Sequence, residues 1–471
     1  MFWPLCLLVA SAVLVATAND LQAHLALQSA SPAAGDTLVS VPREVVLTFT
    51  EEIDLPLSSV VLTGPTGTVA LEPITVSPAG TELRVGIAGA LTPGSYRIEW
   101  QAVGQDGHPV RGESEFEIAP GAEGLPVPAA PVVEPPPPPP PPPSVPPASE
   151  FSTESPLYAG VRWVNYLGII ASIGSVAFLM LLRSASGSGD DRVLQSFTAA
   201  ASRGTVLFGL LATGLLAASI ILRLEAQSHA VLGAGISGTN LRLLLSSDWG
   251  SALLTQLVGG AILAAGLVAA LRTMTVGLPV AAIGALILAA SPAMSSHAAA
   301  VPRLKALAMV SDSLHVLGAG AWLGSLLVFV FVGVSHLRRV EPSNRSHVYA
   351  RLLRTFSALA LTSGAVIVAT GLFAATLQLN GLADFLNTRY GNVLAAKLVL
   401  VTGVFAVGAI NWRRLPRHQE EANAVGLFRR RAGVELVIAV LVVAATAVLV
   451  AVPSPSHELP AAAMNSNTWS E

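Results

Sequence analysis

The residues best suited to chemistry in this chain lie in a short run that pairs a carboxylate with an imidazole. In the run Trp100-Gln-Ala-Val-Gly-Gln-Asp106-Gly-His108-Pro-Val-Arg-Gly112, one residue separates Asp106 from His108. His24 follows an apolar leader, and its amine would join its imidazole if it began the mature chain. Two imidazoles, an amine and a carboxylate suit Cu(II) better than Cu(I). The alternative is an ordinary turn, since Asp-Gly favours turns through its backbone.

The composition excludes an ordinary soluble protein. The chain has 471 residues, of which 52% are hydrophobic and 12% charged, and its mean hydropathy is +0.63. Its single cysteine, Cys6, lies in the leader, so no disulfide or thiolate site is expected beyond it. Residues 24–120 carry twelve Asp and Glu against four Arg. This acidic balance attracts cations and gives no support to nucleic-acid binding.

Residues 1–23 are predicted to be a signal peptide, because an apolar run ends in Ala16-Thr-Ala18. Cleavage after Ala23 makes His24 the first residue and supplies its free amine as a ligand. Cleavage after Ala18 fits the small-x-small rule better and leaves five residues ahead of His24. An uncleaved membrane anchor is a third alternative.

The segment from 24 to 120 has the pattern of an all-β domain. Short alternating runs are separated by Pro and Gly, which predicts strands joined by turns. Such spacing favours an extracytoplasmic β-sandwich of the Ig-like or cupredoxin-like kind. The predicted strands are 45–50, 59–63, 82–86, 94–100 and 113–118.

This domain resembles the CopC copper-resistance family, with matching stretches at 24–35, 46–51, 93–96 and 106–108 in the family's order. The resemblance implies that His24, Asp106 and His108 hold Cu(II), with Glu51 as an additional candidate. Glu51 is alternatively a solvated strand end beside Glu52. Residues 24–120 contain no Met, so the methionine-rich Cu(I) loop of some members is absent.

Residues 121–150 are predicted to be a stiff linker. The nine prolines Pro135–Pro143 favour polyproline II, which at about 3.1 Å per residue spans about 28 Å. This spacer would hold the β-domain above the membrane; a proline-rich ligand for a partner domain is the alternative.

Residues 151–455 are predicted to form an all-α bundle of about eight transmembrane helices, each near the ~20 residues that a bilayer requires. Arginines gather in the segments 183–203, 338–354 and 413–431, which all fall on one side of the predicted topology. The positive-inside rule places these segments in the cytoplasm, and the β-domain and the tail 456–471 outside a bacterial inner membrane. The expected spans lie near 158–182, 204–222, 251–271, 276–296, 306–333, 356–378, 392–411 and 433–452.

Polar residues within two neighbouring helices predict a second site. Asp312 and His315 are three residues apart and share a helix face with Met309. Met294 and His297 form a similar pair at the end of the preceding helix, and the short loop predicts antiparallel neighbours. Thioether and imidazole together suit an exchangeable Cu(I) ion.

Structural alternatives exist for these residues. Arg162, Asp312 and Lys397 fall at similar depth and can form a buried ion-pair network without transport. His315 can serve as packing glue between helices, and the methionines as apolar fillers. Glu435 is interpreted as a local partner of Arg429–Arg431. Small residues predict close helix packing at Gly209, Gly214, Gly259 and Gly260.

The helical part, roughly residues 158 to 452, resembles the CopD family. CopD proteins are linked to copper movement across the inner membrane, and fused CopC–CopD chains to copper uptake, so the resemblance implies these functions. The residues that carry it are Ser296-His297-Ala298, Asp312-Ser-Leu-His315, Trp322-Leu-Gly324, Arg354-Thr-Phe-Ser357, Thr370-Gly371, Tyr390-Gly391, Lys397, Asn411-Trp-Arg413 and Glu435.

The sequence therefore predicts a copper-binding inner-membrane protein that captures Cu(II) outside and mediates copper transport, in the direction of import. Its expected partners are the copper ion, the bilayer, and extracytoplasmic copper chaperones or a reductase. No Walker loop, aspartyl-phosphate signature or cysteine pair is present, so no enzyme activity is expected. Two alternatives stay open: a haem or quinone oxidoreductase with His297 and His315 as axial ligands, and a membrane-tethered copper buffer or sensor.

Overall fold

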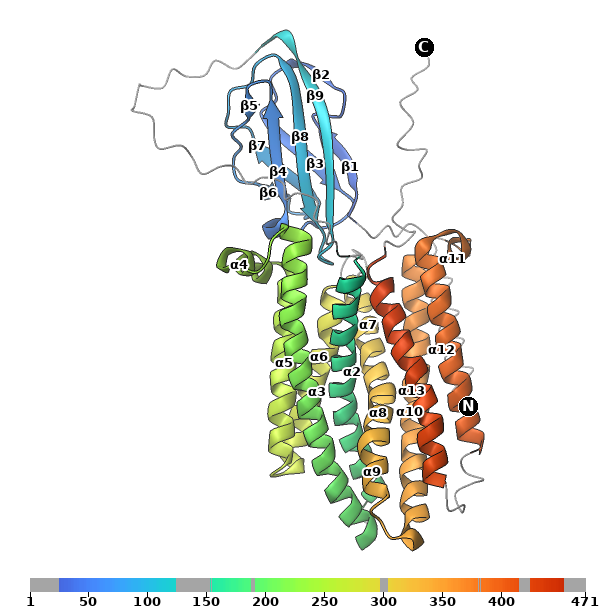
Figure 1. Ribbon diagram of the computed structural model, residues 1–471. Helices are drawn as coiled ribbons and strands as arrows, with labels where there is room; N and C mark the ends of the chain where they lie inside the picture. Colours follow the sequence, from blue (N-terminus) through green and yellow to red (C-terminus); the bar gives the residue numbers. More distant parts are fainter. Residues whose placement is uncertain are drawn as a thin grey trace.

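The computed structural model shows a β-domain standing on one end of a helical bundle, here termed the docked end (Figure 1). The described residues are 25–123, 153, 155–187, 191–296, 304–379, 381, 383–414 and 424–452. The leader, His24, His297, nearly all of the proline-rich linker and the C-terminal tail lie outside them.

The β-domain is a sandwich of two sheets, as predicted. One sheet has the order β1-β3-β7-β6 and the other the order β2-β9-β8-β4-β5. Alternation explains the core, because Val45, Leu47 and Phe49 on β3 all point inward and are buried. The strands are β1 (Leu27–Ser31), β2 (Thr37–Ser40), β3 (Glu44–Phe49), β4 (Ser59–Gly64), β5 (Gly67–Thr68), β6 (Thr75–Val76), β7 (Glu82–Gly86), β8 (Gly94–Val103) and β9 (Pro109–Glu123), with a 3-10 turn η1 (Leu55–Leu57).

The pairing of β8 with β9 positions the candidate metal ligands. These strands are antiparallel, and their register ends with Val103 opposite Pro109. Residues 104–108 therefore form the connecting turn, and this turn faces the bundle (Figure 1). The expected strands are confirmed; β1, β2, β5 and β6 were not expected.

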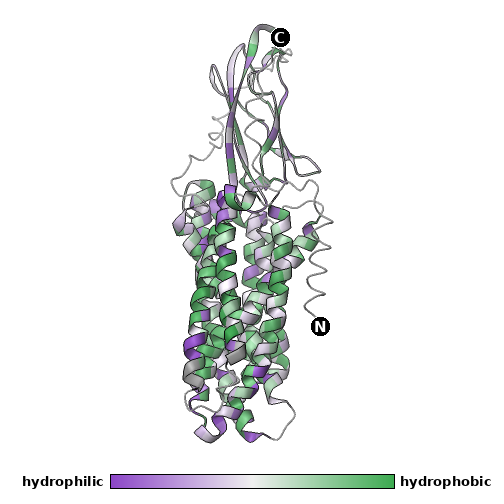
Figure 2. Cartoon of the chain, turned by 90° about the vertical axis from the view of Figure 1, so that its right-hand side faces the viewer, coloured by the Kyte–Doolittle hydropathy of each residue, from purple (hydrophilic) through white to green (hydrophobic). Residues whose placement is uncertain are grey.

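Eight helices of the described chain are long and apolar enough to cross a membrane, which confirms a multi-pass membrane protein. Hydrophobic residues dominate along the bundle in Figure 2. The helices are α2 (Pro156–Ser186), α3 (Arg192–Leu232), α4 (Gly238–Ser246), α5 (Asp248–Ala270), α6 (Met274–Met294), α7 (Lys305–Ala319), α8 (Ser325–Val328), α9 (Val334–Leu337), α10 (Pro342–Gln378), α11 (Asp384–Asn387), α12 (Arg389–Arg414) and α13 (Ala424–Leu449).

The fifth span, Lys305–Leu337, is one helix interrupted by two π-helical turns, η2 (Gly320–Gly324) and η3 (Phe329–Gly333). Such turns insert a residue into the helix and are frequent at functional sites. Nothing in the sequence pattern indicated them.

The four glycines that were predicted to pack closely differ in their surroundings. A Cβ on Gly209 would lie 2.7 Å from Leu267, and one on Gly259 would lie 2.7 Å from the Leu288 backbone, so both positions need glycine. At Gly260 the nearest atom is 3.7 Å away, which is ordinary contact. Gly214 has nothing within 4 Å, so the prediction of close packing there was wrong.

Candidate metal centre

The turn between β8 and β9 brings the predicted ligands Asp106 and His108 together. The backbone N–H of His108 donates to Asp106 Oδ1 over 3.0 Å, and His108 Nδ1 lies 3.1 Å from Asp106 Oδ2. Gly107 between them has φ +79°, a left-handed conformation that favours glycine. Asp106 is buried and His108 is half-buried, so the pair is sheltered at the junction with the bundle.

Glu51, the additional candidate, is buried close to the same turn. Burial, followed by the negative charges of Asp106 and Glu52, raises the pKa of Glu51 from 4.5 to about 9. Its interpretation as a solvated strand end is wrong, since its exposed fraction is 3%. Within the described residues, no three His, Cys, Asp or Glu side chains form a group that could hold a metal ion.

The start of the described chain lies beside the turn. Leu25 is buried, and a Cβ on Gly104 would lie 3.6 Å from Leu25 Cβ and 3.1 Å from Asp106 Oδ1. The backbone N–H of Ala26 donates to the Thr50 hydroxyl, and the backbone N–H of Thr50 donates to Ala26 O. Leu25 and Ala26 are therefore held beside the turn that carries Asp106.

A contact surface joins the β-domain to the docked end. Asp54 Oδ2 accepts from the backbone N–H of Asp248, the first residue of α5, over 2.9 Å. Gln101 Nε2 donates to Val231 O in α3 over 3.3 Å, and Lys305 Nζ donates to Gln105 Oε1 over 2.8 Å. A buried apolar cluster from both parts fills the centre of this surface: Leu57, Val103, Val231 and Leu244.

Burial and a nearby negative charge also raise the pKa of Asp54. Desolvation, followed by the negative charge of Asp248, raises its pKa from 3.8 to about 7, although two backbone hydrogen bonds from α5 oppose the rise. Sequence reasoning missed Asp54. A signal was available in the sequence Ser247-Asp-Trp, which is typical of a helix N-terminus and attracts a carboxylate.

In the bundle, Asp312 and His315 contact different neighbouring helices. Asp312 Oδ2 accepts from Ser296 Oγ over 3.0 Å, which confirms that the α6 end and α7 are neighbours. His315 Nδ1 lies 2.9 Å from Thr370 Oγ1 in α10. The Thr370 hydroxyl donates to Val366 O, so it accepts from His315 Nδ1–H. His315 Nε2 therefore carries the lone pair that a metal needs.

The other polar groups of the bundle have identified contacts. Lys397 in α12 interacts electrostatically with Asp312 and His315. Arg162 Nη1 donates to Ala447 O in α13 over 3.2 Å. Glu435 accepts from Asn411 Nδ2 over 3.3 Å, so the expectation that it pairs with Arg429–Arg431 was wrong. Met294 ends α6 and Met309 lies in the second turn of α7; both are half-buried.

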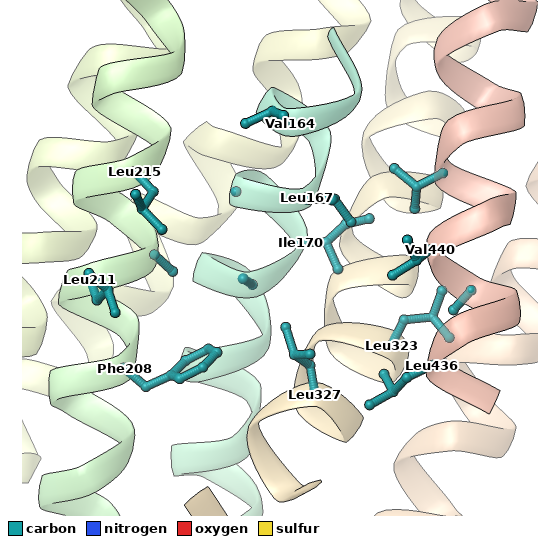
Figure 3. A pocket seen from close by; sticks show the side chains of 15 residues that line it. Val164, Leu167, Ile170, Phe208, Leu211, Leu215, Leu323, Leu327, Leu436 and Val440 are labelled. Carbon is teal, nitrogen blue, oxygen red and sulfur yellow. The ribbon is translucent and has the colours of Figure 1, made fainter. Parts of the chain in front are cut away.

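A cavity of about 380 Å³ opens between α3 and α13 over α2. Figure 3 shows that only hydrocarbon side chains line it, among them Leu167, Phe208 and Leu436. Among the described residues that line it, none carries an imidazole, carboxylate or thioether that could hold copper or haem iron.

Comparison with known proteins connects both parts of the chain to copper. The family model described as CopC domain matches residues 27–119, and the model described as Copper resistance protein D matches residues 350–449. The copper transport protein CutJ of Bacillus subtilis is 24% identical over 460 residues, covering 93% of this chain and 76% of that protein.

The β-domain has relatives of its own. Protein YobA of Escherichia coli is 31% identical over 102 residues, which cover 20% of this chain and 79% of YobA. The crystal structure of CopC from Methylosinus trichosporium is 31% identical, covers 21% of this chain and 95% of that one, and gives a TM-score of 0.19. With a CopC domain followed by a CopD domain in one polypeptide, this chain belongs to the CopC–CopD fusions of the copper-resistance family.

Proposed function

We propose that this chain captures Cu(II) in its β-domain through His24, Asp106 and His108, and mediates copper transport through the bundle in the direction of import. The observation that carries the proposal is the contact of Asp106 with His108 at the junction with the bundle. Leu25 beside Gly104 supports His24 as the third residue. An amine, imidazoles and a carboxylate together suit Cu(II).

The bundle would take the ion onward as Cu(I). His315 Nε2 supports this role, because the hydrogen bond of Nδ1 to Thr370 leaves Nε2 available as a ligand. Met294, Met309 and His297 are proposed as soft partners, and Asp312 as a nearby charge. His315 lies ten residues into the helix that begins at Lys305, or about 15 Å from that end. Reduction of Cu(II) then falls to an external reductase.

The location proposed is a bacterial inner membrane with the β-domain in the periplasm. Residues 1–23 would act as the signal peptide, 121–150 as the linker and 456–471 as an extracytoplasmic tail. Periplasmic copper chaperones are proposed donors, and the protein acts as a transporter rather than an enzyme.

Titration of the full chain with Cu(II), followed by calorimetry and electron paramagnetic resonance, tests the first part. One tight ion with nitrogen and oxygen ligands is expected, and His108→Ala should weaken it by at least about 100-fold. His229→Ala is the matched control, because this histidine pairs with Glu225 at a distance of 3.1 Å and 45% of its side chain is exposed. Equal affinity in wild type and His108→Ala would overturn the assignment.

Copper uptake into vesicles tests the second part. His315→Ala should lower uptake strongly while leaving the Cu(II) titration unchanged. Wild-type vesicles that bind but do not accumulate copper would favour a buffer or sensor. A Soret absorbance at stoichiometric haem would instead favour an oxidoreductase.

A further inference from the structure

The peptide carbonyl between the two candidate ligands is bound by the bundle. Gly107 O accepts from Gln227 Nε2 in α3 over 2.9 Å. Gln227 is buried, with an exposed fraction of 1%. Burial removes the Gln227 amide from water, so breaking its hydrogen bond to Gly107 O would leave a buried donor unsatisfied at a high cost in free energy. The bond thus sets the orientation of the peptide that joins Asp106 to His108.

The turn approaches the helices so closely that only glycine fits. A Cβ on Gly107 would lie 2.8 Å from Trp249 Cδ1 and 3.0 Å from Gln227 Nε2. Trp249 is buried at the start of α5. The turn is therefore in direct contact with two helices of the bundle, in agreement with its place in Figure 1.

Gln227 is itself held in one orientation. The Tyr158 hydroxyl in α2 donates to Gln227 Oε1, which directs the amide nitrogen toward Gly107. The Tyr158 ring carries the Arg162 guanidinium at 4.7 Å from its centroid, and Arg162 reaches Ala447 O in α13. A continuous buried series of contacts thus runs from the turn through α3 and α2 to α13.

We propose that Gln227 and Tyr158 are positioning residues of the copper site, so that Cu(II) affinity depends on the hydrogen bond that Gln227 donates to the turn. This inference rests on the proposed function of Asp106 and His108. A turn held in one conformation by the bundle binds more tightly, because less order is lost on binding. Linkage is reciprocal, so bound Cu(II) strengthens this hydrogen bond by the same factor.

Cu(II) titration of the full chain with Gln227→Leu tests the proposal. This change keeps the side-chain volume and removes the donor to Gly107. We expect affinity about tenfold below wild type, equivalent to about 1.4 kcal/mol, and an altered Cu(II) paramagnetic resonance spectrum. Tyr158→Phe keeps the amide but frees its orientation, so a smaller shift in the same direction is expected.

Gln101→Leu is the matched control. It removes the hydrogen bond to Val231 across the same contact surface and the bond to Leu57 within the β-domain, and it leaves the bond from Gln227 to the turn intact. Wild-type affinity and spectrum in this variant, with both altered in Gln227→Leu, would support the proposal.

Wild-type binding in Gln227→Leu and Tyr158→Phe, or equal losses in Gln227→Leu and Gln101→Leu, would overturn it. Failure of the wild-type chain to bind Cu(II), or binding indifferent to His108→Ala, would instead refute the proposed function.

Discussion

At the scale of single residues, charges within the bundle are compensated by neighbours on other helices. A charged group in a membrane is costly unless it pairs with another group or with backbone carbonyls. Lys397 on α12 and Asp312 on α7 interact electrostatically, and Asp312 also accepts from Ser296. Arg162 satisfies the same requirement through a backbone carbonyl. These contacts join α7 to α12 and α2 to α13.

A double-mutant cycle measures the Lys397–Asp312 interaction. Asp312→Asn alone removes the negative charge that acts on Lys397 and should destabilise the chain by about 1 kcal/mol, a typical coupling energy between neighbouring groups. Lys397→Met should then cost less in the Asp312→Asn background than in wild type. Unfolding in detergent gives the coupling energy, and additive effects of the two changes would contradict the interaction.

The candidate metal site was predictable from sequence only where its contacts are local. Asp106 and His108 are two residues apart in one turn, so their proximity follows from the motif. Gln227 lies 120 residues from Gly107 and binds a backbone carbonyl. A carbonyl leaves no residue pattern, and a glutamine near a helix end has many structural uses, so this partner could not be predicted.

At the scale of elements, α2 packs backbone to backbone against the π-helical turn η2. A Cβ on Gly174 in α2 would overlap with the backbone of Gly324, and one on Gly324 would overlap with Ile170 O. Small residues allow this approach, which compensates for the absence of a hydrophobic driving force between helices in lipid. The irregular helix is therefore held by close contact with its neighbour.

Two glycine-to-alanine changes separate packing from helix propensity. Gly174→Ala should destabilise the chain by about 2 kcal/mol, because the methyl group meets the Gly324 backbone. Gly214→Ala on α3 meets nothing within 4 Å and should stabilise by up to about 1 kcal/mol through helix propensity. Unfolding of both variants in detergent checks this, and equal effects would show that the close approach contributes nothing.

Sequence patterns predicted which helices and strands form, but they gave less information on how these elements pack together. The eight spans followed from apolar length, and the principal strands from alternation between turn residues. The π-helical turns were not predictable, because an apolar helix with an inserted residue keeps the same composition. The prediction for Gly214 was wrong because composition does not show which side of a helix a glycine lies on. Gly214 lies on an exposed face, whereas Gly209 faces α2 and α5.

At the scale of the whole molecule, the β-domain and the bundle form one body through a small number of specific contacts. The residues that make them include Asp54 just before η1, Gln101 near the end of strand β8, and Gly107 in the turn that follows. Periodicity describes the interior of elements and says nothing of their ends, so docking was not predicted. The proline-rich linker suggested a separated domain, whereas the structure shows the domain in contact with the bundle.

Docking should make the stability of the chain depend on pH through Asp54. Its pKa is raised from 3.8 to about 7 by burial and by Asp248. Between these values the folded chain keeps a proton that the unfolded chain has released. Stability should therefore fall as pH rises from about 4 to about 7, and this contribution should stay level at higher pH.

Asp54→Asn isolates that contribution, because asparagine keeps an oxygen that can accept from the Asp248 N–H and carries no charge at any pH. The stability of Asp54→Asn relative to wild type should rise between pH 4 and pH 7 and then stay constant, as measured by thermal unfolding across this range. Asp36→Asn is the control, since Asp36 is an exposed residue that accepts from the Ala33 N–H away from the bundle. A difference between Asp54→Asn and wild type that stays flat with pH, or that Asp36→Asn reproduces, would show that the charge of Asp54 is not buried by docking.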